Sequence, residues 1–104
     1  MARVFFPEDI GHFIASLGEY QIDVFTDLRM VELAGPQRFE FCEFHGDDLW
    51  EYRRLIAPSR YAFLLFAYHK GSDSYIVLHS FRGGPEGPSR SDLREARRKR
   101  RAHQ

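Results

Sequence analysis

Two side chains near the ends of apolar stretches are suited to chemistry. Arg60 stands directly before the apolar run 61–68, and His79 lies near the end of the run 75–81. A guanidinium can bind two oxygens of a carboxylate or phosphate at once, and an imidazole titrates near neutral pH. The ordinary alternatives are a surface arginine at a strand end and a hydrogen-bonded histidine within a strand.

A predicted three-stranded meander over residues 49–81 carries both side chains. Its β-rich runs are separated by turns at 58–59 and 70–73. The middle run, 61–68, is apolar at every position, which predicts a central strand covered on both faces. In the second turn, Gly71 is free to take a positive φ.

Two amphipathic helices are predicted before the meander. The first begins at Pro7 and ends at Gly18, and the second begins near Tyr20 and stops at Gly35. Since neither helix can bury its apolar stripe alone, both are expected to form an αα-hairpin on the sheet. The residues predicted to be buried are Ile10, Phe13, Ile14 and Leu17 in the first helix, and Val24, Phe25, Leu28 and Val31 in the second.

Shorter elements complete the predicted fold. Residues 2–6 and 38–44 are expected to be strands, the second with one face in water, and the Gly/Pro-rich segment 82–88 cannot be regular structure. The order is β-α-α-β-β-β-β-α. It predicts one α+β domain over residues 1–104, with two layers: an antiparallel sheet and the helical hairpin on one of its faces.

The last predicted helix begins at Ser89, its N-cap, and Asp92 three residues later completes a variant of the capping box. Only Leu93 and Ala96 are apolar enough to anchor it. The segment Arg97–Gln104 has no apolar stripe and is expected to fray.

Composition limits the classes of protein. With a single cysteine, Cys42, the chain has no internal disulfide and no multi-cysteine metal site, which fits a reducing compartment. It has no secretory signal pattern and no apolar run near the length of a membrane span. A cytoplasmic location is expected.

Charge is distributed unevenly although the formal net charge is zero. The basic stretch 90–101 carries a local +5, and residues 1–89 carry −5. A cationic tail on an acidic body is typical of a protein whose one end meets a polyanion. The alternative is a terminal helix whose cations pair with the protein's own acids.

Four short motifs follow one another along the chain, and they resemble motifs of a known family. The family is the RelE/ParE superfamily of bacterial toxins, within it the HigB-like, phage-derived branch. The resemblance covers nearly the whole chain, including the helical hairpin, and implies a RelE-like fold. The motifs are Leu49-Trp50-Glu51-Tyr52-Arg53, Arg60-Tyr61, Val77-Leu78-His79-Ser80-Phe81 and Pro88-x-x-x-Asp92-Leu93-x-x-Ala96.

The resemblance implies the toxin of a type II toxin–antitoxin system. Such a toxin is an endoribonuclease, an mRNA interferase that cleaves mRNA on the ribosome and inhibits translation without a metal or other cofactor. Its implied partners are the ribosome, mRNA and a cognate antitoxin, often of the helix-turn-helix type. Attack of a 2′-hydroxyl on the neighbouring phosphate needs a base, a cation and an acid.

The resemblance also assigns roles to single residues. Arg60 matches a phosphate-binding arginine and would clamp the scissile phosphate. His79 is expected to act as acid or base beside it because of its position and its near-neutral titration, since a direct role of this histidine is not general in the family motif. Glu40 lies where some relatives place a carboxylate base, although an exposed acid is the ordinary explanation. His45, expected to be solvent-exposed, is the alternative base.

Arg53 and Arg54 alternate across one strand, so only one of them can lie on the face that the helical hairpin leaves open. The family motif favours Arg53, which is therefore grouped with the catalytic candidates. The residues expected to contact RNA are Arg54, Arg82, Arg97, Arg98, Lys99, Arg100 and Arg101.

One departure from the family leaves an alternative function open. Relatives carry two or more lysines after the position of Phe81, whereas Arg82 is the only cation before Gly83-Gly84. Fewer cations weaken both binding to RNA and charge neutralisation at the phosphate. The alternative is a non-catalytic binding protein, either a ParE-like gyrase inhibitor or an inactive toxin that acts only through its antitoxin.

Overall fold

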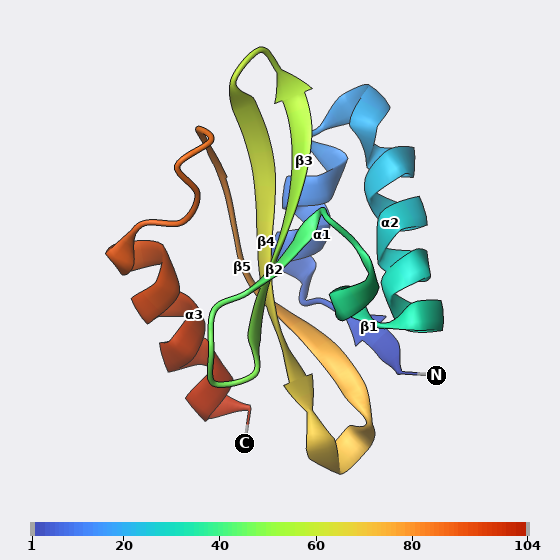
Figure 1. Cartoon of the computed structure of the whole chain (residues 1–104), viewed down its shortest axis with the longest axis vertical. Coiled ribbons are helices and arrows are strands. Elements are labelled where there is room, and N and C mark those ends of the chain that lie inside the picture. The colour runs from blue at the N-terminus through green and yellow to red at the C-terminus, as the bar shows by residue number, and fades with distance from the viewer. Residues whose placement is uncertain (1, 104) are drawn as a thin grey trace.

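The computed structural model describes residues 2–103 as an α+β domain in which three helices pack on a five-stranded sheet (Figure 1). None of the helices in this part of the chain combines the length and hydropathy that a membrane crossing requires. The elements are β1 (Arg3–Phe5), α1 (Glu8–Ala15), α2 (Gln21–Ala34), β2 (Cys42–Phe44), β3 (Leu49–Ala57), β4 (Arg60–His69), β5 (Ser74–Gly83) and α3 (Arg90–Ala102), with short 3-10 turns at Gly18–Tyr20, Pro36–Arg38 and Lys70–Ser72.

The sheet has the strand order β1-β5-β4-β3-β2, so the predicted meander lies at its centre. Adjacent strands from β2 to β5 are antiparallel, whereas β1 pairs with β5 in parallel. The prediction of a purely antiparallel sheet is therefore wrong. β1 and β2 lie at opposite edges of the sheet, and the two helices between them connect these edges. A long connection of this kind lets β1 pair with β5 in parallel, which a short hairpin turn cannot do.

The helical hairpin packs where the apolar stripes predict. Ile14, Val24 and Val31 are fully buried, and they contact one face of the central strands. Phe25 does not belong to this face, contrary to the prediction, and is 40% exposed. Val24 and Val31, two helical turns apart on α2, lie on the buried stripe of the helix. Phe25 lies beside this stripe, and its ring is 6.1 Å from the ring of Phe6 between centroids.

The central strand, β4, is covered on both faces, as its unbroken apolar sequence predicts. Leu64 and Phe66 pack under the helical hairpin, and Leu65 and Ala67 pack with Ala96 of α3 on the other face. Figure 1 shows the sheet between α1 and α2 on one side and α3 on the other. The prediction of two layers is thus wrong, because the last helix supplies a third.

Some local features differ from the expectations. β5 continues through Arg82 and Gly83, so the prediction that segment 82–88 has no regular structure is wrong for its first two residues. Of the predicted strand 38–44, only Cys42–Phe44 pairs with a neighbour, because Pro36 begins a 3-10 turn that ends at Arg38. In the turn after β4, the residue with positive φ is Asp73, at 46°, and not Gly71. An aspartate tolerates this conformation because its carboxylate can bond locally, and here it accepts from the hydroxyl of Tyr68 at 2.6 Å.

The last helix is longer than predicted. The segment expected to fray is helical to Ala102, and Gln104 lies outside the described residues. Arg97 donates to the carbonyl of His45 at 3.2 Å, and Arg100 donates to Asp48 at 3.3 Å. These contacts to the β2–β3 turn replace the apolar anchors that the sequence lacks in this half of the helix.

The capping box of α3 provides a stability test. The Ser89 hydroxyl accepts from the amide of Asp92, and the Asp92 carboxylate accepts from the amide of Ser89. We expect Ser89→Ala to lower the free energy of unfolding by about 1 kcal/mol, since one helix-end amide loses its acceptor. Urea unfolding checks this. Ser91→Ala, an exposed change in the same turn, is the control; an equal loss in both variants would contradict the role of the cap.

Candidate functional site on the sheet face beneath α3

A β-bulge in β5 determines where His79 points. Leu65 pairs with His79, but the next residue, Phe66, pairs with Val77, so β5 contains one additional residue here. Leu78 packs on the α3 side, and the bulge turns His79 to that same side. There the His79 imidazole lies 2.9 Å from the carboxylate of Asp92, measured from Nε2 to Oδ1. Bulges are known to redirect side chains near functional sites.

The carboxylate of Asp92 holds both the imidazole and the helix. Burial raises the pKa of Asp92, but hydrogen bonds from His79 and Ser89 outweigh it and keep the pKa below the ordinary 3.8. Its folded-state pKa is depressed, so its contribution to stability is present above about pH 4 and is lost as pH falls through the lowered pKa. His79 is therefore oriented by an ionised partner at neutral pH.

Arg53 lies on this same face. Its Nε donates to Glu51 at 2.6 Å, and its Nη1 donates to the carbonyl of Pro85 at 3.1 Å. The guanidinium also stacks over the rings of Tyr61 and Phe63, at 5.4 and 5.0 Å from their centroids. The hydrogen bond to Glu51 raises the pKa of Arg53, so the charge persists. The expectation that Arg53, and not its neighbour, lies on the face opposite the helical hairpin agrees with this position.

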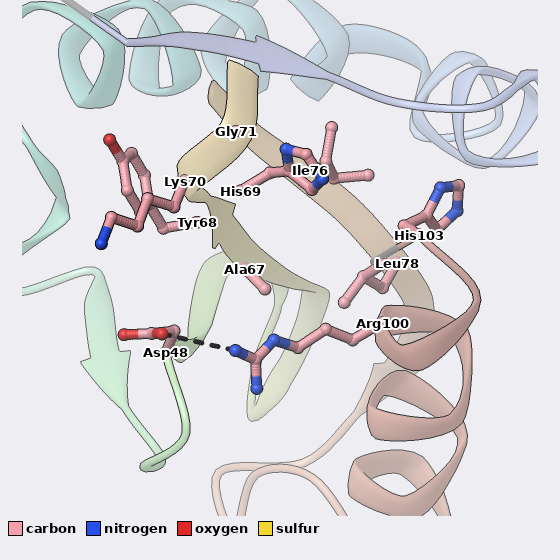
Figure 2. A pocket seen from close by; sticks show the side chains of 10 residues that line it. All are labelled: Asp48, Ala67, Tyr68, His69, Lys70, Gly71, Ile76, Leu78, Arg100 and His103. Atoms are coloured by element: carbon pink, nitrogen blue, oxygen red, sulfur yellow. Dashed lines mark hydrogen bonds and ion pairs between the residues drawn. The ribbon is translucent and has the colours of Figure 1, made fainter. Parts of the chain in front are cut away.

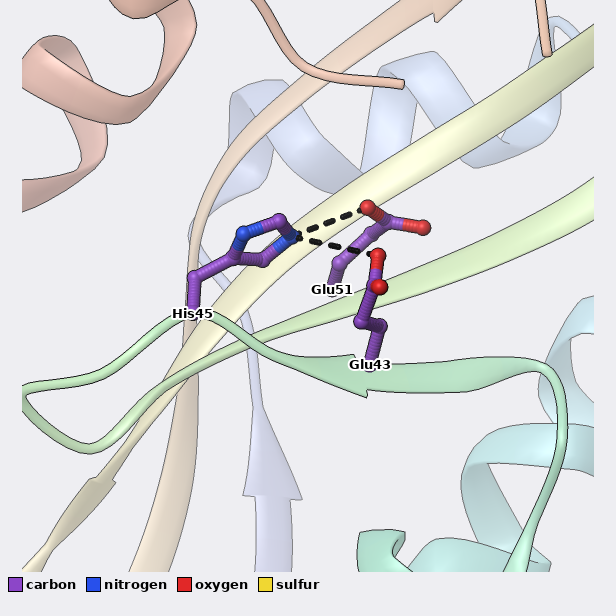
Figure 3. Close-up of side chains that lie close together, drawn as sticks. All are labelled: Glu43, His45 and Glu51. Atoms are coloured by element: carbon purple, nitrogen blue, oxygen red, sulfur yellow. Dashed lines mark hydrogen bonds and ion pairs between the residues drawn. The ribbon is translucent and has the colours of Figure 1, made fainter. Parts of the chain in front are cut away.

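Glu51 is the buried acid of this face, with a side chain that is 1% exposed. One carboxylate oxygen accepts from Arg53, and the other lies 3.0 Å from Nε2 of His45. Figure 3 shows His45 directed toward both Glu51 and Glu43. The sequence predicted a solvent-exposed His45; instead it is about one-fifth exposed, because the β2–β3 turn folds it over β3.

Arg60 and Glu40 lie away from this group. Arg60 is exposed beside the β3–β4 turn, and its side chain has no hydrogen-bond or ion-pair partner within residues 2–103. Strand alternation places its side chain on the sheet face of Ala62, opposite the face of Arg53. Along β4, Arg60 is five residues, or about 16 Å, from Leu65, the residue that pairs with His79. The structure therefore does not bring Arg60 and His79 together. Glu40 is an exposed turn residue before β2.

Two arginines expected to contact RNA are bound to the helical hairpin. Arg54 pairs with Asp23 at 3.0 Å and with Asp27 at 3.3 Å, both on α2. Arg82 donates to the carbonyl and hydroxyl of Ser16 at the end of α1. The strand period that turns Arg53 toward α3 turns these side chains to the opposite face. RNA contact by Arg54 and Arg82 stays a prediction, and both side chains already have partners within the fold.

The basic helix α3 is largely paired with the protein's own acids. Arg98 and Lys99 contact Glu95 on the same helix, and Arg97 and Arg100 reach acids of the β2–β3 turn. Within the described residues, the α3 arginines without such a partner are Arg90, Arg94 and Arg101. These three line an open groove of about 330 Å³. Of the tail residues predicted to contact RNA, only Arg101 is therefore unpaired; Arg90 and Arg94 were not predicted.

A pocket of about 320 Å³ lies between the end of α3 and the β4–β5 hairpin (Figure 2). Apolar side chains, including Ile76 and Leu78, line it together with four basic groups: His69, Lys70, Arg100 and His103. The dashed contact in Figure 2 joins Arg100 to Asp48. The sequence did not indicate this pocket, because its basic residues come from a turn and a helix end that are far apart in the chain.

The outer face of α2 exposes large apolar side chains. Ile22 is 75% exposed and Leu33 is 60% exposed, and Phe25 and Met30 are also exposed. Apolar surface of this kind on one helix marks a candidate protein-binding face. Ile22, Met30 and Leu33 lie outside the stripe that the sequence predicts to be buried, whereas Phe25 was predicted to belong to it.

Comparisons with known proteins add no relative: no family model, no curated protein and no solved structure matches the chain. The site is therefore described by its own geometry. It is a sheet face that combines an oriented imidazole, a guanidinium stacked on aromatic rings and a buried carboxylate.

The buried carboxylate of this face allows a test of its energetic role. We expect Glu51→Gln to lower the free energy of unfolding by about 3 kcal/mol, because Arg53 loses the counter-charge of a buried ion pair. Chemical unfolding with a fluorescence readout measures the change. Glu43→Gln, at an exposed position of the neighbouring strand, should change stability by less than about 0.5 kcal/mol. Equal effects in the two variants would rule out a special role for Glu51.

Cys42 is not an activated nucleophile. Burial, with smaller contributions from Asp27 and Glu51, raises the pKa of its thiol to about 12. We expect iodoacetamide to alkylate the folded protein at pH 8 at least about a hundredfold more slowly than the unfolded chain, since the thiolate is the reactive form. Mass spectrometry over time measures both rates. Comparable rates would contradict a protonated, partly buried thiol.

Proposed function

We propose that this protein is a metal-independent endoribonuclease of the RelE type, the toxin of a type II toxin–antitoxin system that cleaves mRNA on the ribosome. The observation that carries the proposal is the presence of Arg53 and His79 on one sheet face. The four sequence motifs and the order of elements, two helices, a meander and a final helix, support a RelE-like assignment.

The spacing of the two side chains suits a phosphodiester. Arg53, Phe63 and Phe81 form one cross-strand row, and His79 lies two residues before Phe81. The backbones of β3 and β5 are about 10 Å apart across β4, so an arginine and a histidine can reach a phosphate between them from either side. Arg53 would neutralise the pentavalent phosphorane, and His79, held by Asp92, would transfer a proton as acid or base.

The surroundings of Arg53 support RNA as the substrate. Tyr61 and Phe81 are partly exposed and flank the buried ring of Phe63, with which Phe81 stacks at 4.7 Å between centroids. Aromatic rings beside a cation provide a surface for bases of single-stranded RNA. Arg90, Arg94 and Arg101 on α3 would contact phosphates farther along the strand.

An antitoxin is the proposed protein partner. The exposed apolar side chains of α2, among them Ile22 and Leu33, suit a partner that buries them. They lie on the helical hairpin, opposite the face of Arg53 and His79, so this contact would leave the proposed site open.

The test is inducible expression in a bacterium, with primer extension on a translated message. We expect the wild type to arrest growth and to produce in-frame cuts, and His79→Gln to lower cutting at least about a hundredfold, since a glutamine can still donate to Asp92 but cannot transfer the proton. His12→Gln, an exposed histidine on α1, is the matched control. Undiminished cutting in His79→Gln would remove His79 from the mechanism.

Arg60→Ala separates two versions of the same proposal. The resemblance implies a phosphate clamp at Arg60, whereas the position of Arg53 on the face of His79 favours Arg53 in this role. Arg60 is exposed and without a partner in residues 2–103, so its replacement should leave the fold unchanged. Cuts that persist in Arg60→Ala support Arg53, and cuts that vanish support the clamp implied by the family.

The internal pairing of many cations favours one second candidate, a non-catalytic binding protein. Arg54, Arg82 and most of the α3 cations already have partners, which leaves fewer of them for a ribosome. Growth arrest without cuts would support inhibition by binding, as in ParE-like gyrase inhibitors. Absence of arrest would support an inactive member that acts only through its antitoxin.

A further inference from the structure

We propose that Glu43, His45 and Glu51 bind one divalent transition-metal cation of the Zn²⁺ class. None of them contacts the substrate in the proposed RNA cleavage, although Glu51 holds Arg53, so the metal site goes beyond that function. Their ligand atoms all lie within 4.8 Å of one another. In Figure 3 the two carboxylates and the imidazole converge from β2, the following turn and β3.

The distances fit metal coordination. Nε2 of His45 lies 3.0 Å from Oε1 of Glu51 and 3.8 Å from Oε2 of Glu43. Two ligand atoms of a tetrahedral Zn²⁺ ion, each about 2.0–2.1 Å from the metal, are about 3.3 Å apart. The observed separations lie on either side of this value, so small side-chain rotations would place the three atoms around an ion.

The strand register gives an independent reason for a cation at this place. Glu43 and Glu51 are directly opposite each other in the β2–β3 ladder. Like charges in this relation destabilise a sheet. Arg53 pairs with only one oxygen of Glu51, Oε2, and leaves Oε1 directed at His45. A cation between the carboxylates of Glu43 and Glu51 would remove the repulsion between them that Arg53 does not neutralise.

The surroundings suit a bound metal. Arg53 would act as the outer partner that fixes the Glu51 carboxylate, as hydrogen-bonded groups do around many metal ligands. Glu43 is 64% exposed and borders an open hollow of about 420 Å³ that Glu40 also lines, which leaves room for a water as the fourth ligand. One imidazole with two carboxylates favours Zn²⁺ or a similar transition metal over Mg²⁺.

A bound metal ion would stabilise the short edge strand β2. β2 has only three residues and is an outer strand of the sheet, and the β2–β3 turn also anchors Arg97 and Arg100 of α3. An ion bound by Glu43, His45 and the buried Glu51 would therefore connect the edge strand β2, the β2–β3 turn and β3. Through the turn it would also connect to the last helix, α3.

Calorimetric titration of the purified protein with Zn²⁺ tests the proposal without ribosomes or RNA. We expect one Zn²⁺ per chain, and binding at least about tenfold weaker in Glu43→Gln and in His45→Ala. Glu43 is exposed, so the first variant remains folded. His12→Ala is the matched control, because His12 forms an exposed pair with Glu8 at 3.6 Å. Unchanged binding in Glu43→Gln, or an equal loss in His12→Ala, would overturn the site.

Co²⁺ provides a readout of geometry. Replacing Zn²⁺ with Co²⁺ should give the intense visible absorption of a four-coordinate ion in the wild type, and this absorption should be lost in His45→Ala. Weak absorption typical of six-coordinate Co²⁺, or an equal affinity for Mg²⁺, would contradict a site built on the imidazole. Because neither measurement depends on RNA cleavage, failure of the metal site and failure of the proposed nuclease are distinguished.

Discussion

The rest of the structure depends on the burial of β4 from both sides. Six consecutive residues of this strand, 62–67, are buried, so neither face can remain in water. The helical hairpin covers one face through Ile14 and Val24, and α3 covers the other through Ala96. Apolar burial is the main source of stability in a domain of this size. The position of α3 is therefore a requirement of the core.

The covering of the second face by α3 creates the candidate site. A helix with only Leu93 and Ala96 as apolar anchors needs polar attachments, and these come from His79, the β2–β3 turn and the capping box. The same contacts orient His79 and fold His45 over Glu51. The residues that attach α3 to the sheet on this face thus include His79 and His45, which also belong to the proposed sites.

The two proposals use neighbouring parts of one sheet face. Nuclease action would use Arg53 and His79 with the aromatic row across β4, whereas metal binding would use Glu43, His45 and Glu51 at the β2 edge. Arg53 touches both groups because its guanidinium holds Glu51 and also stacks on Tyr61 and Phe63. A change at Arg53 would therefore affect both sites, whereas His79 and Glu43 each belong to one of them.

The sequence by itself determined the order of elements, the central position of β4, the helical hairpin and the capping box of α3. Those features follow from local periodicity and from residues close together in the chain. Only the tertiary structure decided the parallel pairing of β1, the third layer and the partners of the cations. Arg97, Arg100, Arg54 and Arg82 found acids or carbonyls remote in sequence, and the bulge before His79 depends on strand register, which local patterns do not encode. Together with the local pairs of Arg98 and Lys99 with Glu95, the contacts of Arg97 and Arg100 neutralise most of the cationic tail.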